Sequence, residues 1–299
     1  MTAAPTMGRV HVLDDLASRP GSANSLIRTV VGVAIRACGG WLSTATCIEL
    51  MAAAGVPANR TRTALTRVKG KGLLVAERRD GRAGYALTPG GAWLLARGDR
   101  RIYGQRSMRD GDPWCLISFS IPEEQRSLRH QFRQRLSWIG AGNVSPALWI
   151  VPDYLRTELE EIVEDLELTA QVTLFTVQGI QNAGVSGSAL ACEWWDLDAL
   201  RALHDDFLGA HSATLASCAA EPDAAVRFGL WIRALDAWRP IPYLDPGLPD
   251  ALLPPDWPGA RSGELFRALH AATRDAVSAI LDRHGAEVGV EPRARGASA

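Results

Sequence analysis

The chain has 299 residues, of which 47% are hydrophobic, and a formal net charge of −1. This hydrophobic fraction supports buried cores and excludes a chain that is disordered throughout. The charge is unevenly divided, because residues 1–106 hold 16 Lys and Arg against 6 Asp and Glu, whereas residues 107–299 hold 16 against 27. The first part carries +10 and the second −11, which predicts two functions on one chain.

The sequence shows none of the usual signs of a membrane, secreted or disulfide-rich protein. The apolar run at residues 30–35 stops at Arg36, which is too short to cross a bilayer. The first residues lack the basic flank and apolar stretch of a signal peptide. The five cysteines are widely spaced and form no CxxC pair, so neither a zinc ribbon nor a disulfide framework is indicated. We therefore expect a cytoplasmic protein.

Residues 24–106 follow the pattern of a small helical DNA-binding domain, after a polar arm at residues 1–23 that we expect to be disordered. A first helical pattern covers residues 26–35 and ends at Gly39 and Gly40. A second helix begins after an N-cap that is either Ser43 or Thr44. A short turn at residues 55–57 precedes a third helix over residues 58–69. Three helices with this turn indicate a helix-turn-helix.

A hairpin follows the third helix. Residues 73–79 and 82–87 read as strands joined at Asp80 and Gly81, a dipeptide typical of two-residue hairpin turns. A hairpin at this place is the wing of a winged helix. The sequence therefore predicts a winged helix-turn-helix with a basic wing tip.

The third helix predicts the DNA-reading surface. With Leu65 inside, helical spacing puts Ala58, Thr61, Ala64 and Val68 on the same buried side. The opposite side carries arginine, asparagine and threonine, which read base edges, while nearby lysines and the wing arginines suit phosphates. The predicted DNA-binding residues are Asn59, Arg60, Arg62, Thr63, Thr66, Arg67, Lys69, Lys71, Arg78, Arg79 and Arg82.

Two other interpretations of this surface stay open. Any solvated helix face carries arginine and threonine, and a winged helix can also contact proteins. DNA binding is favoured because the helix spacing, the turn, the hairpin and the regional charge agree. A further helix begins at Thr88 and Pro89, and we expect its basic continuation, residues 97–106, to extend the surface that meets DNA.

The segment 112–186 predicts an α+β domain. Strand patterns at residues 114–120, 143–145, 148–151 and 172–177 alternate with helical patterns at 123–139 and 155–166. The order β-α-β-β-α-β is the ferredoxin-like arrangement. A nuclease on this domain would need carboxylates near the end of the first strand, where the chain has residues Ser118, Phe119 and Ser120 instead. We expect no metal site there.

The segment 190–283 predicts a mainly helical domain, followed by a disordered tail at residues 284–299. Helical patterns cover residues 194–208, 213–217, 223–237 and 264–281, and an irregular proline-rich stretch covers 239–259. His204, Asp205, Asp206 and His211 are expected on a solvated helix face rather than at a metal.

Several motifs, in the same order along the chain, resemble the PaaX family of bacterial transcriptional repressors of phenylacetic acid catabolism and related regulators. The resemblance spans roughly residues 24–283. It is carried by residues 62–68 with Gly72, by residues 85–90, 100–103 and 194–197, and by the D-P-G-L-P and L-L-P-P-D-W-P-G sequences at 245–249 and 252–259.

The resemblance implies an α+β multidomain fold with a winged helix-turn-helix, a Cas2-like, ferredoxin-like middle domain and a helical carboxy-terminal domain. It also implies a homodimer on a palindromic double-stranded DNA operator. The expected function is repression of aromatic-acid catabolic genes of the phenylacetate type, relieved by an aryl- or acyl-CoA thioester such as phenylacetyl-CoA. No other cofactor and no membrane partner is expected.

An effector of this kind would need an aromatic lining with arginines for its phosphates. The candidates are Trp231, Arg233, Trp238, Arg239 and Trp257, although core packing of the tryptophans is the competing interpretation. We expect no catalytic residues. The enzymatic alternatives are a metal-dependent nuclease on the middle domain and an acyl-CoA hydrolase, and a ligand-independent activator or architectural protein is a third class.

Overall fold

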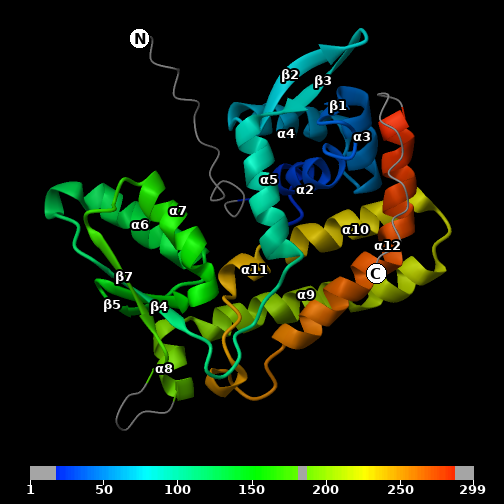
Figure 1. Ribbon diagram of the computed structural model, residues 1–299. Helices are drawn as coiled ribbons and strands as arrows, with labels where there is room; N and C mark the ends of the chain where they lie inside the picture. Colours follow the sequence, from blue (N-terminus) through cyan, green and yellow to red (C-terminus); the bar gives the residue numbers. More distant parts are fainter. Residues whose placement is uncertain (1–17, 181–186, 287–299) are drawn as a thin grey trace, which may run out of the picture. The chain divides into compact units, whose positions relative to one another are not determined.

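The computed structural model describes residues 18–180 and 187–286. The chain forms two compact units (Figure 1), and each unit is assembled from segments far apart in the sequence. The first unit contains residues up to 100 together with 207–238 and those from 263 onward. The second contains residues 101–206 and 239–262. The fold is therefore multidomain α+β, as the sequence predicts.

The amino-terminal elements of the first unit are helices around a small sheet. The strands are antiparallel in the order β1-β3-β2. The elements are α2 (Ala23–Ala34), β1 (Trp41–Ser43), α3 (Thr44–Ala53), α4 (Ala58–Gly70), β2 (Leu74–Arg79), β3 (Arg82–Leu87) and α5 (Pro89–Ile102). The predicted helices and both hairpin strands are confirmed, and β1 is an additional strand that the sequence analysis did not identify.

Local side-chain chemistry explains where these elements begin and turn. Ser43 is the N-cap of α3, since its hydroxyl accepts the Thr46 N–H at 2.9 Å. Ser22 caps α2 in the same way through the Ser25 N–H at 3.2 Å. Asp80 and Gly81 have φ of 49° and 76°, the left-handed conformation that a two-residue hairpin turn requires.

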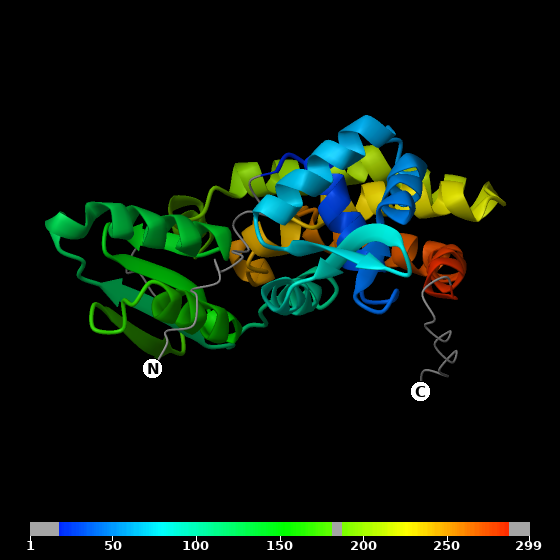
Figure 2. The ribbon, with the colours of Figure 1, turned by 90° about the horizontal axis from the view of Figure 1, so that it is seen from above.

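Helices α10 and α12 from the carboxy-terminal half complete the first unit, together with residues 207–220 of α9 (Leu197–Ala220). Helix α10 (Ala224–Trp238) lies beside α2 and α3 in both ribbon views (Figure 1 and Figure 2). Helix α12 (Gly259–Ala286) packs on α10 through stacked aromatic rings, with Trp238 and Phe266 centroids 4.7 Å apart at 12°. The first unit is thus a composite of both ends of the chain.

A buried carboxylate joins α10 to the start of α2. Asp236 is fully buried, and its oxygens accept hydrogen bonds from the Gly21 N–H at 2.7 Å, the Ser25 hydroxyl at 2.7 Å and the Thr29 hydroxyl at 2.6 Å. Bonds to a charged acceptor are stronger than neutral ones, and a buried carboxylate needs several of them. The first helix is therefore held by a residue more than 200 positions away.

The second unit contains the four-stranded antiparallel sheet, in the order β5-β6-β4-β7. Helices α6 and α7 cover one face, where Phe132 and Leu159 pack against Ile117 and Val151. The β-α-β-β-α-β order predicted for this segment is confirmed. The elements are β4 (Trp114–Phe119), α6 (Arg126–Trp138), β5 (Gly142–Ser145), β6 (Leu148–Pro152), α7 (Arg156–Asp165) and β7 (Val172–Val177), with 3-10 turns Glu123–Gln125 and Asp153–Leu155.

The opposite face of this sheet meets a second apolar cluster. Trp114 and Ile150 pack there with Trp195, Leu200 and Leu248. These residues come from the sheet, from the start of α9 and from the proline-rich stretch. The remaining elements of this region are α8 (Gly187–Trp194), α9 (Leu197–Ala220), α11 (Ile241–Leu244) and the 3-10 turn Asp250–Leu252.

The carboxy-terminal half differs from the predicted helices in extent. Helix α9 is continuous over a stretch that the sequence patterns divided into two helices, and α12 extends beyond residue 281 at its end. The segment 190–283, interpreted from sequence as one domain, contributes residues to both compact units. Most of the predicted amino-terminal arm and residues 287–299 of the predicted tail lie outside the described residues. No helix in the described ranges is long and apolar enough to cross a membrane.

Replacing Asp236 by Ala tests the link between α10 and α2. The change leaves the buried Ser25 and Thr29 hydroxyls without this acceptor, so we expect the free energy of unfolding to fall by about 3 kcal/mol. Thermal and urea unfolding of the full chain measure it. Asp236→Asn, which keeps the shape and one acceptor oxygen, should lose less. Asp205→Ala, at an exposed position, is the control. Equal stability of Asp236→Ala and Asp205→Ala would contradict the stabilising role of Asp236.

Candidate nucleic-acid interface

Helix α4 presents two chemically distinct faces. Thr61, Ala64, Leu65 and Val68 are buried, as the helical spacing predicts. The helix contains no Asp or Glu. Every predicted DNA-contacting residue in this region is exposed: Asn59, Arg60, Arg62, Thr63, Thr66, Arg67, Lys69 and Lys71. The outer face of α4 therefore exposes arginine, lysine, asparagine and threonine side chains with no carboxylate among them.

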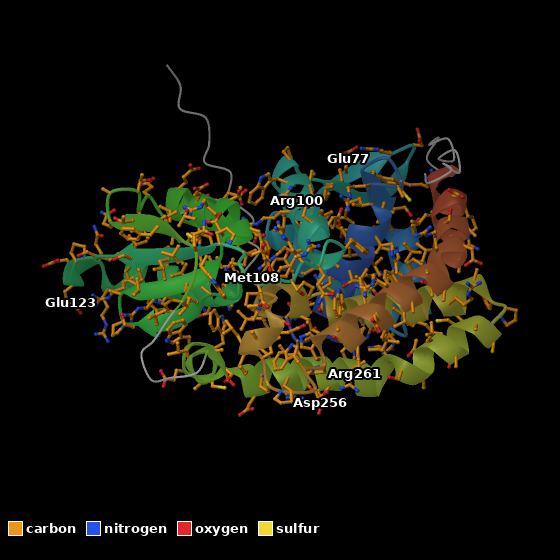
Figure 3. The ribbon with its side chains drawn as sticks, turned by 60° about the horizontal axis from the view of Figure 1, so that its bottom comes forward. Glu77, Arg100, Met108, Glu123, Asp256 and Arg261 are labelled. Carbon is orange, nitrogen blue, oxygen red and sulfur yellow. The ribbon has the colours of Figure 1, made fainter. Side chains whose placement is uncertain are left out.

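The hairpin β2–β3 carries the other predicted arginines. Arg78 and Arg82 are exposed and Arg79 is half-buried. Glu77, labelled on the hairpin in Figure 3, accepts from Arg79 Nε at 2.6 Å. This acidic residue offsets part of the charge near the hairpin tip. The Glu77 carboxylate also fixes the orientation of the Arg79 guanidinium through this short ion pair.

A buried tryptophan supports the two arginines that flank the turn. The Arg79 and Arg82 guanidinium carbons lie 5.7 Å and 5.9 Å from the Trp41 ring centroid. Trp41 is fully buried and donates from Nε1 to the Glu77 carbonyl at 3.2 Å. Gly84 makes room for this ring, since a Cβ at Gly84 would collide with Trp41 and with the Leu42 carbonyl. Cation–π contact at this range restrains the arginines.

Part of the basic continuation of α5 is buried, although Arg100 and Arg106 are exposed. Arg97 and Arg101 are buried, with 6% and 8% exposure. Arg101 donates to the carbonyls of Ile139 and Tyr243 at 3.0 and 3.3 Å. The Arg106 guanidinium lies 4.7 Å from the Tyr154 ring centroid. The prediction was wrong for Arg97 and Arg101, because periodicity alone does not show that another segment of the chain covers a basic helix end.

The five effector candidates fall in different places. Trp231 and Trp238 are buried in the first unit, where Trp231 stacks on His270 with centroids 4.9 Å apart. Burial lowers the pKa of His270, which favours the neutral ring in this stack. Arg233 is exposed on α10.

Arg239 and Trp257 belong to the second unit. Arg239 is buried, and the Trp257 ring lies beside the Arg201 guanidinium, with 5.4 Å between centroid and Cζ. Three of the five candidates thus lie in the first unit and two in the second.

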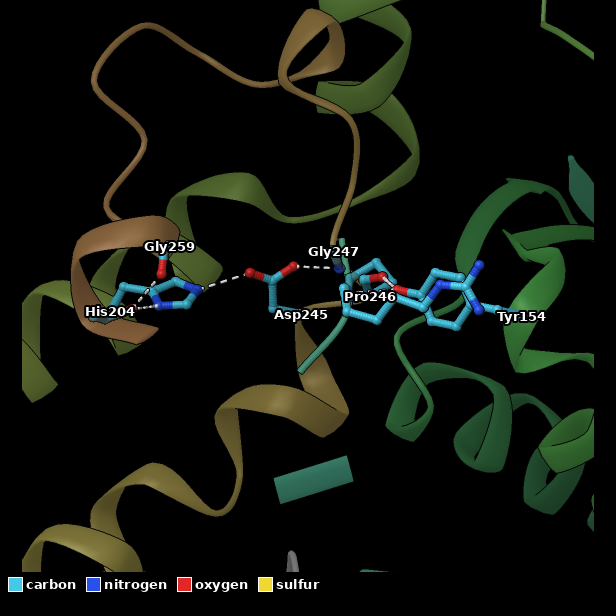
Figure 4. A network of polar contacts seen from close by, with 8 residues as sticks. Tyr154, His204, Asp245, Pro246, Gly247 and Gly259 are labelled. Carbon is cyan, nitrogen blue, oxygen red and sulfur yellow. Dashed lines mark hydrogen bonds and ion pairs between the residues drawn. The ribbon is translucent and has the colours of Figure 1, made fainter. Parts of the chain in front are cut away.

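A buried chain of polar side chains organises the second unit (Figure 4). His204 Nε2 lies 2.8 Å from Asp245 Oδ2, and its Nδ1 lies 2.6 Å from the Ser262 hydroxyl. The second Asp245 oxygen accepts the Gly247 N–H at 2.8 Å. The Gly247 carbonyl in turn accepts the Met108 N–H at 2.8 Å. His204 thereby links α9 to the start of α12 and to the D-P-G-L-P turn.

The expectation that His204 lies on a solvated helix face was wrong. Its side chain is fully buried, whereas Asp205 and Asp206 are exposed and His211 is half-buried. Its partners are more than 40 positions away, so helix periodicity around residue 204 could not reveal them. Within the described ranges, no three His, Cys, Asp or Glu side chains are grouped as a metal site requires.

The acyl-CoA hydrolase alternative can be compared with a serine, histidine and carboxylate found together in the second unit: Ser262, His204 and Asp245. In a hydrolytic triad, the histidine Nε2 takes the serine proton and Nδ1 is oriented by the carboxylate. Here the two ring nitrogens have the reverse partners, Ser262 is fully buried, and its hydroxyl also donates to the Gly259 carbonyl at 2.9 Å. The Ser262 hydroxyl is thus enclosed and held by two hydrogen-bond partners, and the arrangement differs from that of a hydrolytic triad.

The Tyr154 hydroxyl forms a hydrogen bond with the turn that follows Asp245. This hydroxyl donates toward the Pro246 carbonyl and lies 3.0 Å from the Arg106 carbonyl. Burial raises the pKa of Tyr154, which keeps the phenol protonated as a donor. The D-P-G-L-P segment at residues 245–249 is therefore a packed turn held by hydrogen bonds within the second unit.

Comparisons with known proteins agree with these features. Family models match residues 22–91 (PaaX-like protein), 107–188 (PaaX protein central Cas2-like domain) and 195–283 (PaaX-like protein C-terminal domain). The transcriptional repressor PaaX of Escherichia coli (strain K12) is 24% identical over 273 residues, which cover 89% of this chain and 85% of that protein.

A solved structure is also similar. The uncharacterized protein Rv0674 from Mycobacterium tuberculosis aligns with a TM-score of 0.53 and 26% identity, covering 90% of this chain and all of that one. The fold is that of a multidomain α+β protein, and the family model over residues 107–188 names the middle domain Cas2-like. The three family matches then identify it: this chain belongs to the PaaX family.

Gly84→Ala tests whether Trp41 sets the position of the hairpin arginines. The added methyl group must displace the Trp41 ring or the Leu42 carbonyl, and overpacking of this kind costs about 1–3 kcal/mol. We expect a lower melting temperature and altered near-ultraviolet circular dichroism. Ala83→Ser, at the exposed neighbouring position, is the control and should leave both unchanged. Equal melting temperatures for the two variants would show that the Trp41 ring can move away from the added methyl group at no cost, and would contradict this prediction.

Proposed function

We propose that this chain is a DNA-binding transcriptional repressor in which the segment from α2 to β3 is a winged helix-turn-helix. The observation that carries the proposal is the outer face of α4, which is exposed, basic and free of carboxylates. Helix α4 would lie in the major groove, where arginine forks onto guanine and asparagine onto adenine. The β2–β3 hairpin would act as the wing and contact phosphates.

Three further observations support this proposal. The helices and strands follow one another as helix, strand, helix, helix and hairpin, with β1 closing the sheet beside β3. The exposed face of α4 contains Arg60, Arg62 and Arg67, in a region of the sequence that carries +10. The relative from Escherichia coli is named a transcriptional repressor.

The proposed partners are a palindromic double-stranded DNA operator and a second copy of the chain, in the cytoplasm. The twofold symmetry of a homodimer would match two half-sites on the DNA. The proposed effector is an aryl- or acyl-CoA thioester of the phenylacetate type, which would relieve repression by binding one conformation of the dimer better than the other. These elements rest on the properties that family membership implies.

For the effector we keep two of the candidate residues, Arg239 and Trp257, in the second unit. The Trp257 ring is half-buried, and Arg201 lies against it. An aromatic face beside a guanidinium suits a ligand that combines an aromatic group with phosphates. Trp231 and Trp238 fill the core of the first unit, and Arg233 of that unit lies against Gly55.

DNA binding is tested with the promoter region beside the gene that encodes the chain. We expect the wild-type protein to shift this DNA at modest salt, and Arg67→Ala to weaken specific binding by about 1–3 kcal/mol. Fluorescence anisotropy against the promoter and a scrambled duplex gives both affinities. Lys69→Ala, at a phosphate position, should weaken both duplexes alike. Failure of the wild-type protein to bind would reject the proposal.

Thermal unfolding in the presence of phenylacetyl-CoA tests the effector. A ligand that binds the native state raises its stability by RT ln(1 + [L]/Kd), which is about 2.7 kcal/mol at a hundredfold excess over Kd. We expect a higher melting temperature and release of the promoter DNA, with smaller effects from free coenzyme A. Trp257→Ala should reduce both. A thioester series that leaves melting and DNA binding unchanged would remove this class of effector.

A further inference from the structure

Helix α10 carries an arginine to the turn between α3 and α4. Gly229, Arg233 and Asp236 follow helical spacing along the side of α10 that faces α2 and α3. A Cβ at Gly229 would collide with the Ala53 carbonyl, so α10 and the end of α3 approach closely. Asp236 fixes the same helix face to α2. Arg233 is therefore presented from a firmly anchored helix.

The guanidinium of Arg233 lies directly against Gly55. A Cβ at Gly55 would collide with it, and Gly55 adopts a φ of +77°, which suits glycine at this turn. Gly55 lies between the end of α3 at Ala53 and the start of α4 at Ala58. The positive charge is thereby placed at the entrance to the exposed α4 face.

Arg233 differs from Arg227 and Arg283, two arginines on the carboxy-terminal helices of the same unit, because no described residue pairs with its charge. Among the described residues it forms no hydrogen bond and no ion pair, and the side chain is exposed. Arg227, six residues earlier on α10, is instead paired with Asp275 Oδ2 at 2.9 Å and with the Ala272 carbonyl. Arg283 on α12 pairs with Glu49 at 2.8 Å. The Arg233 charge is available for an external anion.

We propose that Arg233 binds a DNA phosphate beside the groove that α4 occupies. This inference rests on the proposed DNA-binding function. The major groove is about 12 Å wide and a helix with its side chains nearly fills it, so backbone phosphates lie along the flanks of the helix. Gly55 lies just before the amino-terminal end of α4, where the chain would enter the groove past a phosphate backbone. Arginine is suited to a phosphate there because its planar fork donates two hydrogen bonds at once.

This assignment gives the carboxy-terminal part of the chain a direct role in DNA binding. Arg233 lies in the stretch matched by the PaaX-like protein C-terminal domain, whereas the α4 residues lie in the stretch matched as PaaX-like protein. The DNA-binding surface is then composite, with base-reading residues from one end of the chain and a phosphate contact from the other. Arg233 is then a DNA-binding residue and no longer a candidate for binding the effector, as the sequence alone had suggested.

The salt dependence of promoter binding tests the proposal, with Arg233→Gln in the full chain. Loss of one phosphate contact makes the plot of log K against log salt shallower by about 0.9. The decline in affinity between about 50 and about 200 mM salt should then be about threefold smaller than for the wild type. Specific and scrambled duplexes should weaken by the same factor. Arg233→Lys, which keeps the charge, should retain the wild-type slope.

Two controls separate this role from others. Arg274→Gln removes one positive charge from the exposed surface of α12 and should keep the wild-type affinity and slope. Thermal unfolding of Arg233→Gln should match the wild type, because the exposed side chain contributes little to packing. An unchanged slope in Arg233→Gln overturns the inference, whether or not the melting temperature falls, and leaves the proposed function standing. Absence of DNA binding by the wild-type protein rejects both.

Discussion

The carboxylate of Asp236 is the interaction on which the first unit depends. It accepts hydrogen bonds from the amide of Gly21 and the hydroxyls of Ser25 and Thr29, all at the start of α2. Burial of a charge is costly unless donors compensate it, so the position of α10 against α2 is tightly defined by this one group. The close contact between Gly229 and Ala53 follows from the same docking. Because Arg233 lies on the same helix, this docking also places its guanidinium against Gly55.

The second unit uses an analogous device. His204 joins α9 to Asp245 and Ser262, and the other oxygen of Asp245 fixes the following glycine turn. Both networks join residues that are far apart in the sequence. In each network, a buried polar group specifies which segments of the chain pack together. Any other arrangement would leave that group buried without a hydrogen-bond partner, which costs free energy. The proline-rich stretch is irregular yet well packed for this reason.

Local sequence patterns were sufficient for the elements whose residues interact within a few positions. The faces of α4 follow from its helical period, and the β2–β3 turn follows from Asp80 and Gly81. The order of strands and helices in the four-stranded sheet also follows from alternating patterns. Patterns were insufficient for Arg97 and Arg101, whose burial depends on what packs over α5. They were equally insufficient for His204, whose polar partners lie on other elements.

By itself, the sequence determined that the amino-terminal third is basic, that one face of α4 carries arginine, asparagine and threonine side chains, and which family the motifs resemble. These properties depend on composition and short-range periodicity, which are written in consecutive residues. Only the tertiary structure decided that α10 and α12 complete the unit containing α4, that Trp231 and Trp238 are core residues, and that Arg233 lies at the turn before α4. These facts depend on contacts between distant segments, which hydrophobic pattern alone does not specify.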